Sequence, residues 1–380
     1  MKRLTTILMA ALLSFAAVVA GCGGGVGTGG TGSFAQGTIS GFGSIIVNGV
    51  HYDDSAAAVS DDDGAGRSRD DLRLGMSVQI EAGDVVNGAA TAQSIRYASE
   101  ISGPVATVDA ANARFTLLGQ TVAVDALTVF DDRLAGGLAA LAAGQRVEVY
   151  ATWDATALRY RATRVEPSSA NGNFRLRGVA SELSATNRTV KIGSGRFTWT
   201  GNTPAGLADG AFVKVQVQSA PAGTALWTLL GASSGEVRPP EGRDVRVKGP
   251  VTAFTSTASF VVNGLTVNAT GASVSGGTLA LGVRVEVRGR MAAGVLQASE
   301  VRVEAGEAPG DDFQLEGGLS NLDTAAATFK LRNVTVAWSA QTQFSGGTAA
   351  QLANGRKVKV KGVLSADGTR VEARSIELEG

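Results

Sequence analysis

The residues best suited to chemistry are aspartates near the N-terminal end of the chain, grouped in a short polar stretch around Gly64. The candidate metal ligands among them are Asp61, Asp63, Asp70 and Asp71. Several carboxylates around a glycine turn could hold calcium, a hard cation that binds oxygen ligands. Their spacing differs from that of an EF-hand loop, and Arg67 and Arg69 lie among them as counter-ions. A solvated acidic loop is therefore the favoured interpretation, with calcium binding as the alternative.

The chain contains one His and one Cys, which restricts the chemistry that it can support. His51 lies between the apolar residues Val50 and Tyr52 in an alternating segment, so we expect its side chain to face solvent. A Ser-His-Asp triad would need this His to be buried beside a Ser, and a zinc site needs more His or Cys ligands. No two carboxylates stand out as a glycosidase pair, because most alternate with Lys or Arg. The sequence therefore predicts that the protein is not an enzyme.

Neither nucleic acid nor a row of stacked sugars is indicated by the composition. The 34 Lys and Arg residues balance 34 Asp and Glu residues, so the formal net charge is zero, whereas a basic domain is the usual footprint of nucleic-acid binding. Aromatic residues make up only 6% of the chain. Trp199 and Trp338 fall at apolar positions of alternating segments, which predicts core or rim positions.

The first 21 residues have the pattern of an export signal. Lys2 and Arg3 precede an apolar stretch from Ile7 to Ala20, which is too short and wrongly flanked for a stable membrane span. The stretch ends in Val-Ala-Gly-Cys, which resembles the bacterial lipobox with Cys22 as the acylated residue. Acyl chains on one Cys give lasting attachment, because each buried methylene contributes about 0.8 kcal/mol. We therefore expect residues 1–21 to be a lipoprotein signal peptide and Cys22 to anchor the protein to a membrane.

Residues 22–34 follow the signal as a tether rich in Gly. Such a segment buries little apolar surface and behaves as a flexible linker. The residue after Cys22 is Gly23 rather than the Asp that retains lipoproteins in the inner membrane. The sequence therefore points to the cell envelope, and to the outer membrane in preference to the inner membrane.

An internal repeat organises the rest of the chain. The pattern L-x-x-G-x-x-V-x-[VI] occurs five times, about every 70 residues, which is typical of a tandem array. Its glycines are Gly75, Gly144, Gly210, Gly282 and Gly355. The repeats are expected at residues 35–98, 99–168, 173–238, 243–306 and 311–380. No Pro-rich or Gly-rich break separates the first two, so we expect these two to pack as a pair.

Each repeat has the order strand, strand, strand, short helical turn, strand, strand. Apolar residues alternate with charged ones at 146–149 and 357–360, which predicts half-buried strands. The Leu and the Gly of the repeated pattern indicate one helical turn with a glycine C-cap. This is the element order of the OB-fold, a small five-stranded barrel. The fold is therefore predicted to be all-β, a tandem array of about five OB-like barrels, with another small β-meander as the alternative.

The first repeat resembles a known family. Its segments GFGSIIVNGV at 41–50, Tyr52-Asp53 and LRLGM at 72–76 are similar to the first repeat of a bacterial lipoprotein family known as the domain of unknown function DUF5666. Later repeats keep the Phe-Gly-Val and Leu-Gly-Val positions but lack Gly-Phe-Gly-Ser, and repeat three departs most. The resemblance implies no activity and no catalytic residues.

These features predict a non-enzymatic lipoprotein of the cell envelope that binds or scaffolds a partner through its repeats. The membrane is one expected partner, through Cys22, and an envelope protein or glycan is another. Nucleic acid and resident cofactors are not expected, apart from the calcium alternative. A carboxylate-dependent envelope hydrolase and a calcium-dependent adhesin are the competing hypotheses.

Overall fold

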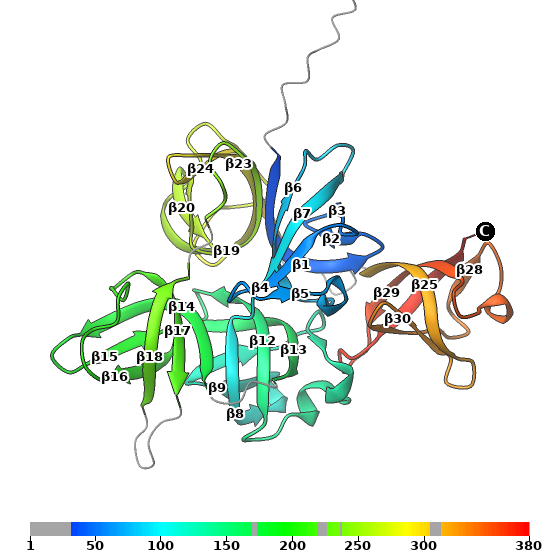
Figure 1. Ribbon diagram of the computed structural model, residues 1–380, viewed down its shortest axis with the longest axis horizontal. Coiled ribbons are helices and arrows are strands. Elements are labelled where there is room, and N and C mark those ends of the chain that lie inside the picture. The colour runs from blue at the N-terminus through cyan, green and yellow to red at the C-terminus, as the bar shows by residue number, and fades with distance from the viewer. Residues whose placement is uncertain (1–31, 169–172, 219–225, 236–237, 305–312, 380) are drawn as a thin grey trace, which may run out of the picture.

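The computed structural model describes residues 32–168, 173–218, 226–235, 238–304 and 313–379, and these form an all-β protein (Figure 1). The signal peptide, Cys22 and most of the tether lie outside the described residues. Five small closed barrels follow one another along the chain, which confirms the predicted fold class. None of the described helices is long and apolar enough to span a membrane.

Barrel 1 shows the common strand order. β1 (Ser33–Phe42) pairs antiparallel with β2 (Ile45–Val47), and β2 pairs antiparallel with β3 (Val50–Asp53). β3 then runs parallel to β7 (Ala89–Tyr97), and β6 (Ser77–Ala82) pairs antiparallel with both β7 and β1. This closes a five-stranded barrel whose third and last strands are parallel, the arrangement predicted from the element order.

Shorter elements of barrel 1 form the acidic loop. β4 (Ala58–Asp61) runs parallel to β7 and pairs antiparallel with β5 (Gly66–Arg67). The 3-10 turn η1 (Arg69–Asp71) then leads to β6. The predicted acidic loop is therefore a short hairpin followed by a turn.

Barrels 2 to 5 repeat this topology. In each, the first strand pairs antiparallel with the second strand and with the fourth barrel strand, and the third runs parallel to the last. Barrel 2 contains β8 (Ile101–Asp109), η2 (Ala110–Asn112), β9 (Arg114–Leu117), β10 (Gln120–Ala123), β11 (Val129–Phe130), η3 (Asp132–Leu134), η4 (Gly137–Ala140), β12 (Arg146–Asp154) and β13 (Arg159–Pro167). Barrel 3 contains β14 (Phe174–Ser184), β15 (Thr189–Ile192), β16 (Gly195–Trp199), β17 (Phe212–Gln218) and β18 (Trp227–Ser234). Barrel 4 contains β19 (Asp244–Ser256), β20 (Ser259–Val262), β21 (Leu265–Asn268), β22 (Ser273–Ser275), β23 (Arg284–Ala292) and β24 (Val295–Glu304). Barrel 5 contains β25 (Phe313–Asp323), β26 (Thr328–Leu331), β27 (Val334–Ala337), β28 (Gln343–Ser345), η5 (Ala349–Gln351), β29 (Lys357–Leu364) and β30 (Val371–Leu378).

The repeated Leu-x-x-Gly segment is a turn that closes each barrel. All five of its leucines are buried, and all five glycines have φ between 81° and 89°, a conformation that strains residues with a Cβ. In barrel 1, the N–H of Gly75 donates to the carbonyl of Ile39 on β1 at 2.9 Å, and the other four glycines make the equivalent bond. The predicted helical turn was wrong for barrels 3 and 4, where this segment holds only turns, and it is a 3-10 turn in barrels 1, 2 and 5. The positive φ therefore serves the bond to the first strand rather than a helix C-cap.

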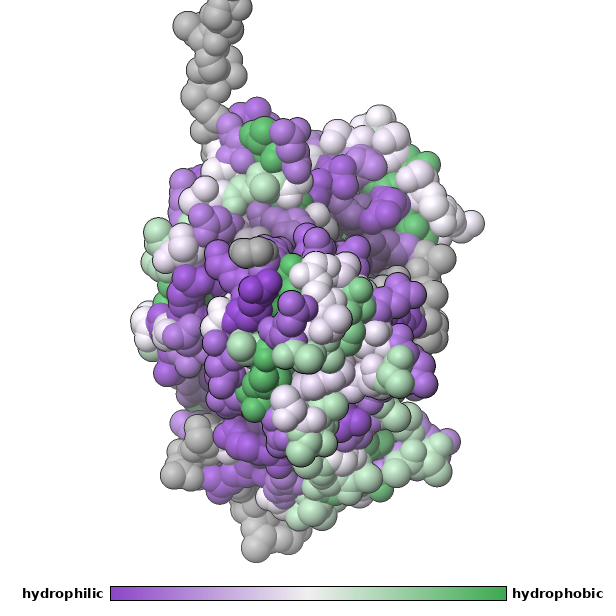
Figure 2. Space-filling model, turned by 90° about the vertical axis from the view of Figure 1, so that its right-hand side faces the viewer, coloured by the Kyte–Doolittle hydropathy of each residue, from purple (hydrophilic) through white to green (hydrophobic). Residues whose placement is uncertain are grey.

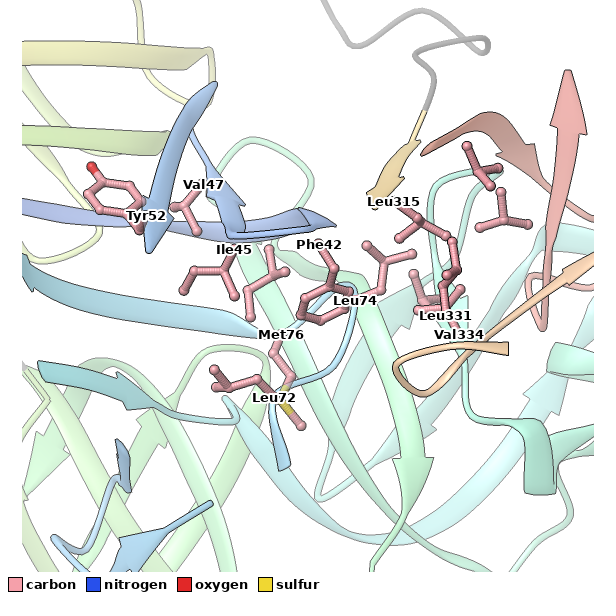
Figure 3. Packing of buried hydrophobic residues seen from close by; sticks show 14 of the residues in the cluster. Phe42, Ile45, Val47, Tyr52, Leu72, Leu74, Met76, Leu315, Leu331 and Val334 are labelled. Carbon is pink, nitrogen blue, oxygen red and sulfur yellow. The ribbon is translucent and has the colours of Figure 1, made fainter. Parts of the chain in front are cut away.

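The apolar cores extend across barrel boundaries. Barrels 1 and 5 share one buried cluster, which also takes Val129 and Tyr150 from barrel 2. Figure 3 shows Phe42 and Leu74 of barrel 1 beside Leu331 of barrel 5 at this shared core. Barrels 2 and 3 share a second cluster, and barrel 4 forms a third cluster that includes Phe34 of barrel 1. The barrels are therefore docked together by buried apolar surface, which helps because a barrel of this size is only marginally stable alone.

Barrel 1 is the hub of the assembly. Its strand β1 runs parallel to β19 of barrel 4 and, further along, parallel to β25 of barrel 5, while β8 of barrel 2 pairs with β14 of barrel 3. In Figure 1 the blue barrel 1 accordingly lies between the other barrels. The first two repeats contact each other as predicted, through the shared core and the hydrogen bond from Arg164 to the carbonyl of Leu74, but barrel 1 also docks on barrels 4 and 5. These contacts join surfaces far apart in the sequence, which linker composition does not reveal.

Candidate functional site

The acidic loop of barrel 1 is neutralised by cations. The carboxylate of Asp61 pairs with Arg67 at 2.6 Å and also accepts hydrogen bonds from two backbone N–H groups of the loop. Asp63 pairs with Lys214 of barrel 3 at 2.7 Å. Both carboxylates therefore have their negative charge compensated, so neither is held ready for a cation.

The other two predicted calcium ligands lie on η1. Asp71 accepts a hydrogen bond from the backbone N–H of Ser68 at 2.9 Å and so caps this turn, whereas Asp70 is exposed. Among the described residues, no three His, Cys, Asp or Glu side chains are grouped to hold a metal ion. The structure thus does not assemble the predicted set of Asp61, Asp63, Asp70 and Asp71.

Asp62, which lies between the predicted ligands Asp61 and Asp63, has a docking role that the sequence did not predict. Its side chain is only 3% exposed, and it pairs with Arg177 and, at 2.6 Å, with Lys214, both from barrel 3. Burial acts to raise the pKa of Asp62, but the two cations outweigh it and hold the pKa below its ordinary value. Asp62 directly follows β4, where alternation from the buried Val59 would turn it outward, so strand periodicity gave no signal for its burial. Asp62 therefore docks barrel 3 against barrel 1.

A second buried aspartate docks barrel 5. Asp54 is 2% exposed, and both of its oxygens accept hydrogen bonds at 3.0 Å from the guanidinium of Arg332. Arg332 in turn lies over the ring of Phe42, 4.8 Å from its centroid. Paired, hydrogen-bonded charges of this kind are costly to break, because removing one partner leaves the other buried without a counter-ion.

The single His and the tryptophans lie where the alternation predicted. His51 is exposed, and its Nδ1 is 3.3 Å from the hydroxyl of Ser44; no carboxylate contact of this His is present among the described residues. Trp199 is buried, and Trp338 is half-buried against Phe329 of the shared core. These residues therefore form neither a catalytic triad nor an exposed stacking row.

The largest cluster of carboxylates lines a cleft of about 470 Å³ between barrels 1 and 2. Glu148 on β12 and Glu166 on β13 lie directly opposite each other in the strand register. Burial, with a further contribution from the charge of Glu166, raises the pKa of Glu148, whose carboxylate accepts a hydrogen bond from Ser99 at 2.6 Å. Glu166 pairs with Arg164 at 2.6 Å. This is a facing pair of carboxylates, but one member has a buried counter-ion.

Another ionisable group lies at the junction of barrels 1 to 4. Glu100, in the segment between β7 and β8, faces a small cavity of about 60 Å³ together with Tyr160 and Arg177. Burial is the largest influence on this carboxyl and raises its pKa to about 7, although Arg177 opposes the rise. Its carboxylate has no hydrogen-bond donor among the described residues. Glu100 is thus a half-buried acid whose pKa is raised toward neutral.

The comparisons with known proteins agree with the repeat architecture. The model of a domain of unknown function, DUF5666, matches residues 102–166, 248–302 and 316–377, which correspond to barrels 2, 4 and 5. The motif of the first repeat, which carried the resemblance in the sequence, lies outside these matches, as does barrel 3. A search of curated proteins finds no match. Three of its five barrels match this one family model, which is consistent with a repeat-containing DUF5666 protein.

Proposed function

We propose that this protein is a cell-envelope lipoprotein, attached to a membrane through Cys22, whose docked barrels act as a binding scaffold without catalytic activity of their own. The observation that carries the proposal is the hub position of barrel 1, which follows the N-terminal segment directly and docks on all four other barrels. An anchor on this segment would hold the whole assembly at the membrane surface.

Pairing of the ionisable groups supports a binding role over a hydrolytic one. Catalytic carboxylates need an environment that separates their pKa values and leaves both free to meet the substrate. Here Glu166 is held by Arg164, and Asp61 is held by Arg67. Charges that satisfy each other inside the protein stabilise its shape, and a stable shape is what a scaffold requires.

The surface also fits a binding protein. The face shown in Figure 2 carries hydrophobic side chains in small separate areas among hydrophilic ones. An interface that forms and dissociates is about as apolar as the rest of a protein surface, so this mixture is compatible with one. We therefore propose an envelope protein or a glycan as the partner, in addition to the membrane, and we place the anchor in the outer membrane because Gly23 follows Cys22.

Lipidation is tested by expressing the full chain and its Cys22→Ser variant in a Gram-negative host supplied with an alkyne fatty acid. Cys22 is the only Cys, so the variant removes the single acylation site. We expect the wild type to carry the label and to sediment with outer membranes, and the variant to lose both properties. Label on the variant, or an unlabelled wild type, would overturn the anchor.

The scaffold role is tested by crosslinking in living cells with the lipidated protein as bait, read by mass spectrometry. A dominant protein or glycan adduct that maps to one barrel supports the proposal.

The competing carboxylate-dependent hydrolase is favoured by the facing pair Glu148 and Glu166. Turnover of an envelope substrate by the purified chain, lost in Glu148→Gln and kept in a variant of the exposed Glu377, would replace the scaffold by that enzyme.

A further inference from the structure

We propose that a cationic cavity at the junction of barrels 1, 2 and 5 binds a small ligand that carries a phosphate or carboxylate group on an apolar body. This inference rests on the proposed binding function and deepens it by naming a ligand class. The cavity has a volume of about 390 Å³, within the usual range of ligand pockets. Barrel 1 contributes the turn before β6, and barrel 2 contributes β11, η3 and β13. Barrel 5 contributes β26, β27, the end of β29 and the segment between β29 and β30.

The charges around the cavity are predominantly positive. Two carboxylates line it, and both are already paired: Asp131 with Arg164 at 2.7 Å and Asp132 with Lys330 at 2.6 Å. The five cations that line it are Arg73, Arg133, Arg164, Lys330 and Arg370. Glu166 and Glu372, outside the lining, pair with Arg164 and Arg370, so five positive charges against four negative ones leave an excess of one at the cavity. The neighbouring cleft between barrels 1 and 2 has the opposite balance, with six carboxylates and four arginines.

Arg73 is the cation best placed to meet an anion. Among the described residues, its guanidinium contacts the backbone carbonyls of Asp70 and Leu72, the latter at 3.1 Å, and no carboxylate. Arg370, on another wall, pairs only with the exposed Glu372, and exposed pairs of this kind are weak. The planar fork of a guanidinium matches a carboxylate or a phosphate with two parallel hydrogen bonds. The cavity therefore presents two arginines that an anion could engage without breaking a buried ion pair.

The rest of the lining is apolar apart from Asn333 and Thr369, and two of its apolar residues are fixed by hydrogen bonds of their backbone. Leu74 is held because its carbonyl accepts a hydrogen bond from Arg164 at 3.3 Å, and Phe130 is held by its N–H bond to Gly368 at 2.8 Å. Figure 3 shows Leu74 and Val334 on the two sides of the contact between barrels 1 and 5. The apolar residues of the lining are Leu74, Val129, Phe130, Val334 and Leu364. Four of them are at most 9% exposed, whereas Leu364 is half-buried, so an apolar part of the ligand is expected to lie against Leu364.

The test is calorimetric titration of the full chain carrying Cys22→Ser, which needs no detergent. Phenyl phosphate and benzoate present the two anions on the same ring, inorganic phosphate lacks the ring, and benzyl alcohol lacks the charge. We expect phenyl phosphate or benzoate to bind more tightly than inorganic phosphate, and benzyl alcohol not to bind measurably. Whichever ring compound binds more tightly identifies phosphate or carboxylate as the natural group.

The matched variants are Arg73→Gln in the cavity and Arg188→Gln at an exposed arginine of barrel 3. We expect Arg73→Gln to weaken binding of the aromatic anion by about tenfold or more, as is usual for a lost charged hydrogen bond, and Arg188→Gln to leave it unchanged. An unaltered Tm of each free variant shows that the barrels remain docked. Failure of both aromatic anions to bind the wild type, or equal affinities of the two variants, would overturn this inference. Neither result bears on the lipid anchor, which the acylation experiment tests separately.

Discussion

Replacing the half-buried acid Glu100 by Gln should make the protein more stable at alkaline pH. Desolvation at the junction of four barrels raises the pKa of Glu100 to about 7, from its ordinary value of 4.5. Gln has nearly the shape of the protonated acid but never ionises. The variant therefore removes the cost of a buried negative charge while keeping the packing around Tyr160, which lines the same cavity.

The sign and the size follow from the linkage of protonation to folding. Because the folded pKa lies above the unfolded one, the folded state binds the proton more tightly, and stability falls as pH rises from about 4.5 to about 7. A rise of about 2.5 pKa units corresponds to about 3.5 kcal/mol at about 1.4 kcal/mol per unit. The charged groups that face Glu100 are Arg96, Arg177 and Lys248 from the cavity wall and, through its charge, Asp62. Their interactions with the carboxylate charge are absent in the Gln variant and are already contained in the net rise of the pKa.

Scanning calorimetry of both proteins between pH 4.5 and 8.5 measures the effect. We expect equal Tm values near pH 4.5 and a Tm of Glu100→Gln that exceeds the wild type increasingly until about pH 7, after which the difference stays constant. Glu377→Gln, at an exposed position of β30, is the control and should show no such trend. A difference that does not depend on pH, or a less stable variant at pH 8, would refute the reasoning.

Three further predictions concern the turns, the docking of barrels and the acidic loop. Gly75→Ala should cost about 2–4 kcal/mol of stability and Gly144→Ala only about 1–2 kcal/mol. Both glycines have a φ of 84°, but an added Cβ would lie 2.5 Å from the carbonyl oxygen of Thr163 at Gly75 and would meet nothing within 4 Å at Gly144. Equal losses of Tm in the two variants would contradict this. Asp62→Asn should cost about 3–5 kcal/mol of stability, since it leaves buried Arg177 without its counter-ion. Chemical denaturation measures this loss, and an equal loss in Asp63→Asn would show that burial of the ion pair is not the cause. Because the pKa of Asp62 is lowered in the folded state, its contribution should be present near neutral pH and be lost as acid protonates it. Millimolar calcium or a chelator should leave the Tm of the wild type unchanged, and a clear rise with calcium would restore the calcium-dependent alternative.

Much of the fold could be predicted because its determinants are local. The buried leucine and the glycine of the Leu-x-x-Gly turn recur in every barrel with the same backbone conformation, since both serve contacts within one repeat. Alternation with period two identified the strands and placed His51 and Trp199 correctly. The helical turn was predicted less well, because a few residues that end in Leu and Gly fit a 3-10 turn, an open turn or a helix equally.

The sequence by itself therefore determined the number of barrels, their strand order and the motif that closes them. Only the tertiary structure decided which aspartate would be buried. Asp62 pairs with Arg177, which lies 115 positions along the chain, whereas its neighbour Asp61 pairs with Arg67 of the same loop and Asp63 pairs with Lys214. It also decided that barrel 1 is the hub and that Arg73 faces a cavity shared with barrel 5. Strand periodicity and turn conformation arise from neighbouring residues, whereas docking depends on the complementarity of whole surfaces, and no short pattern records which surfaces will meet.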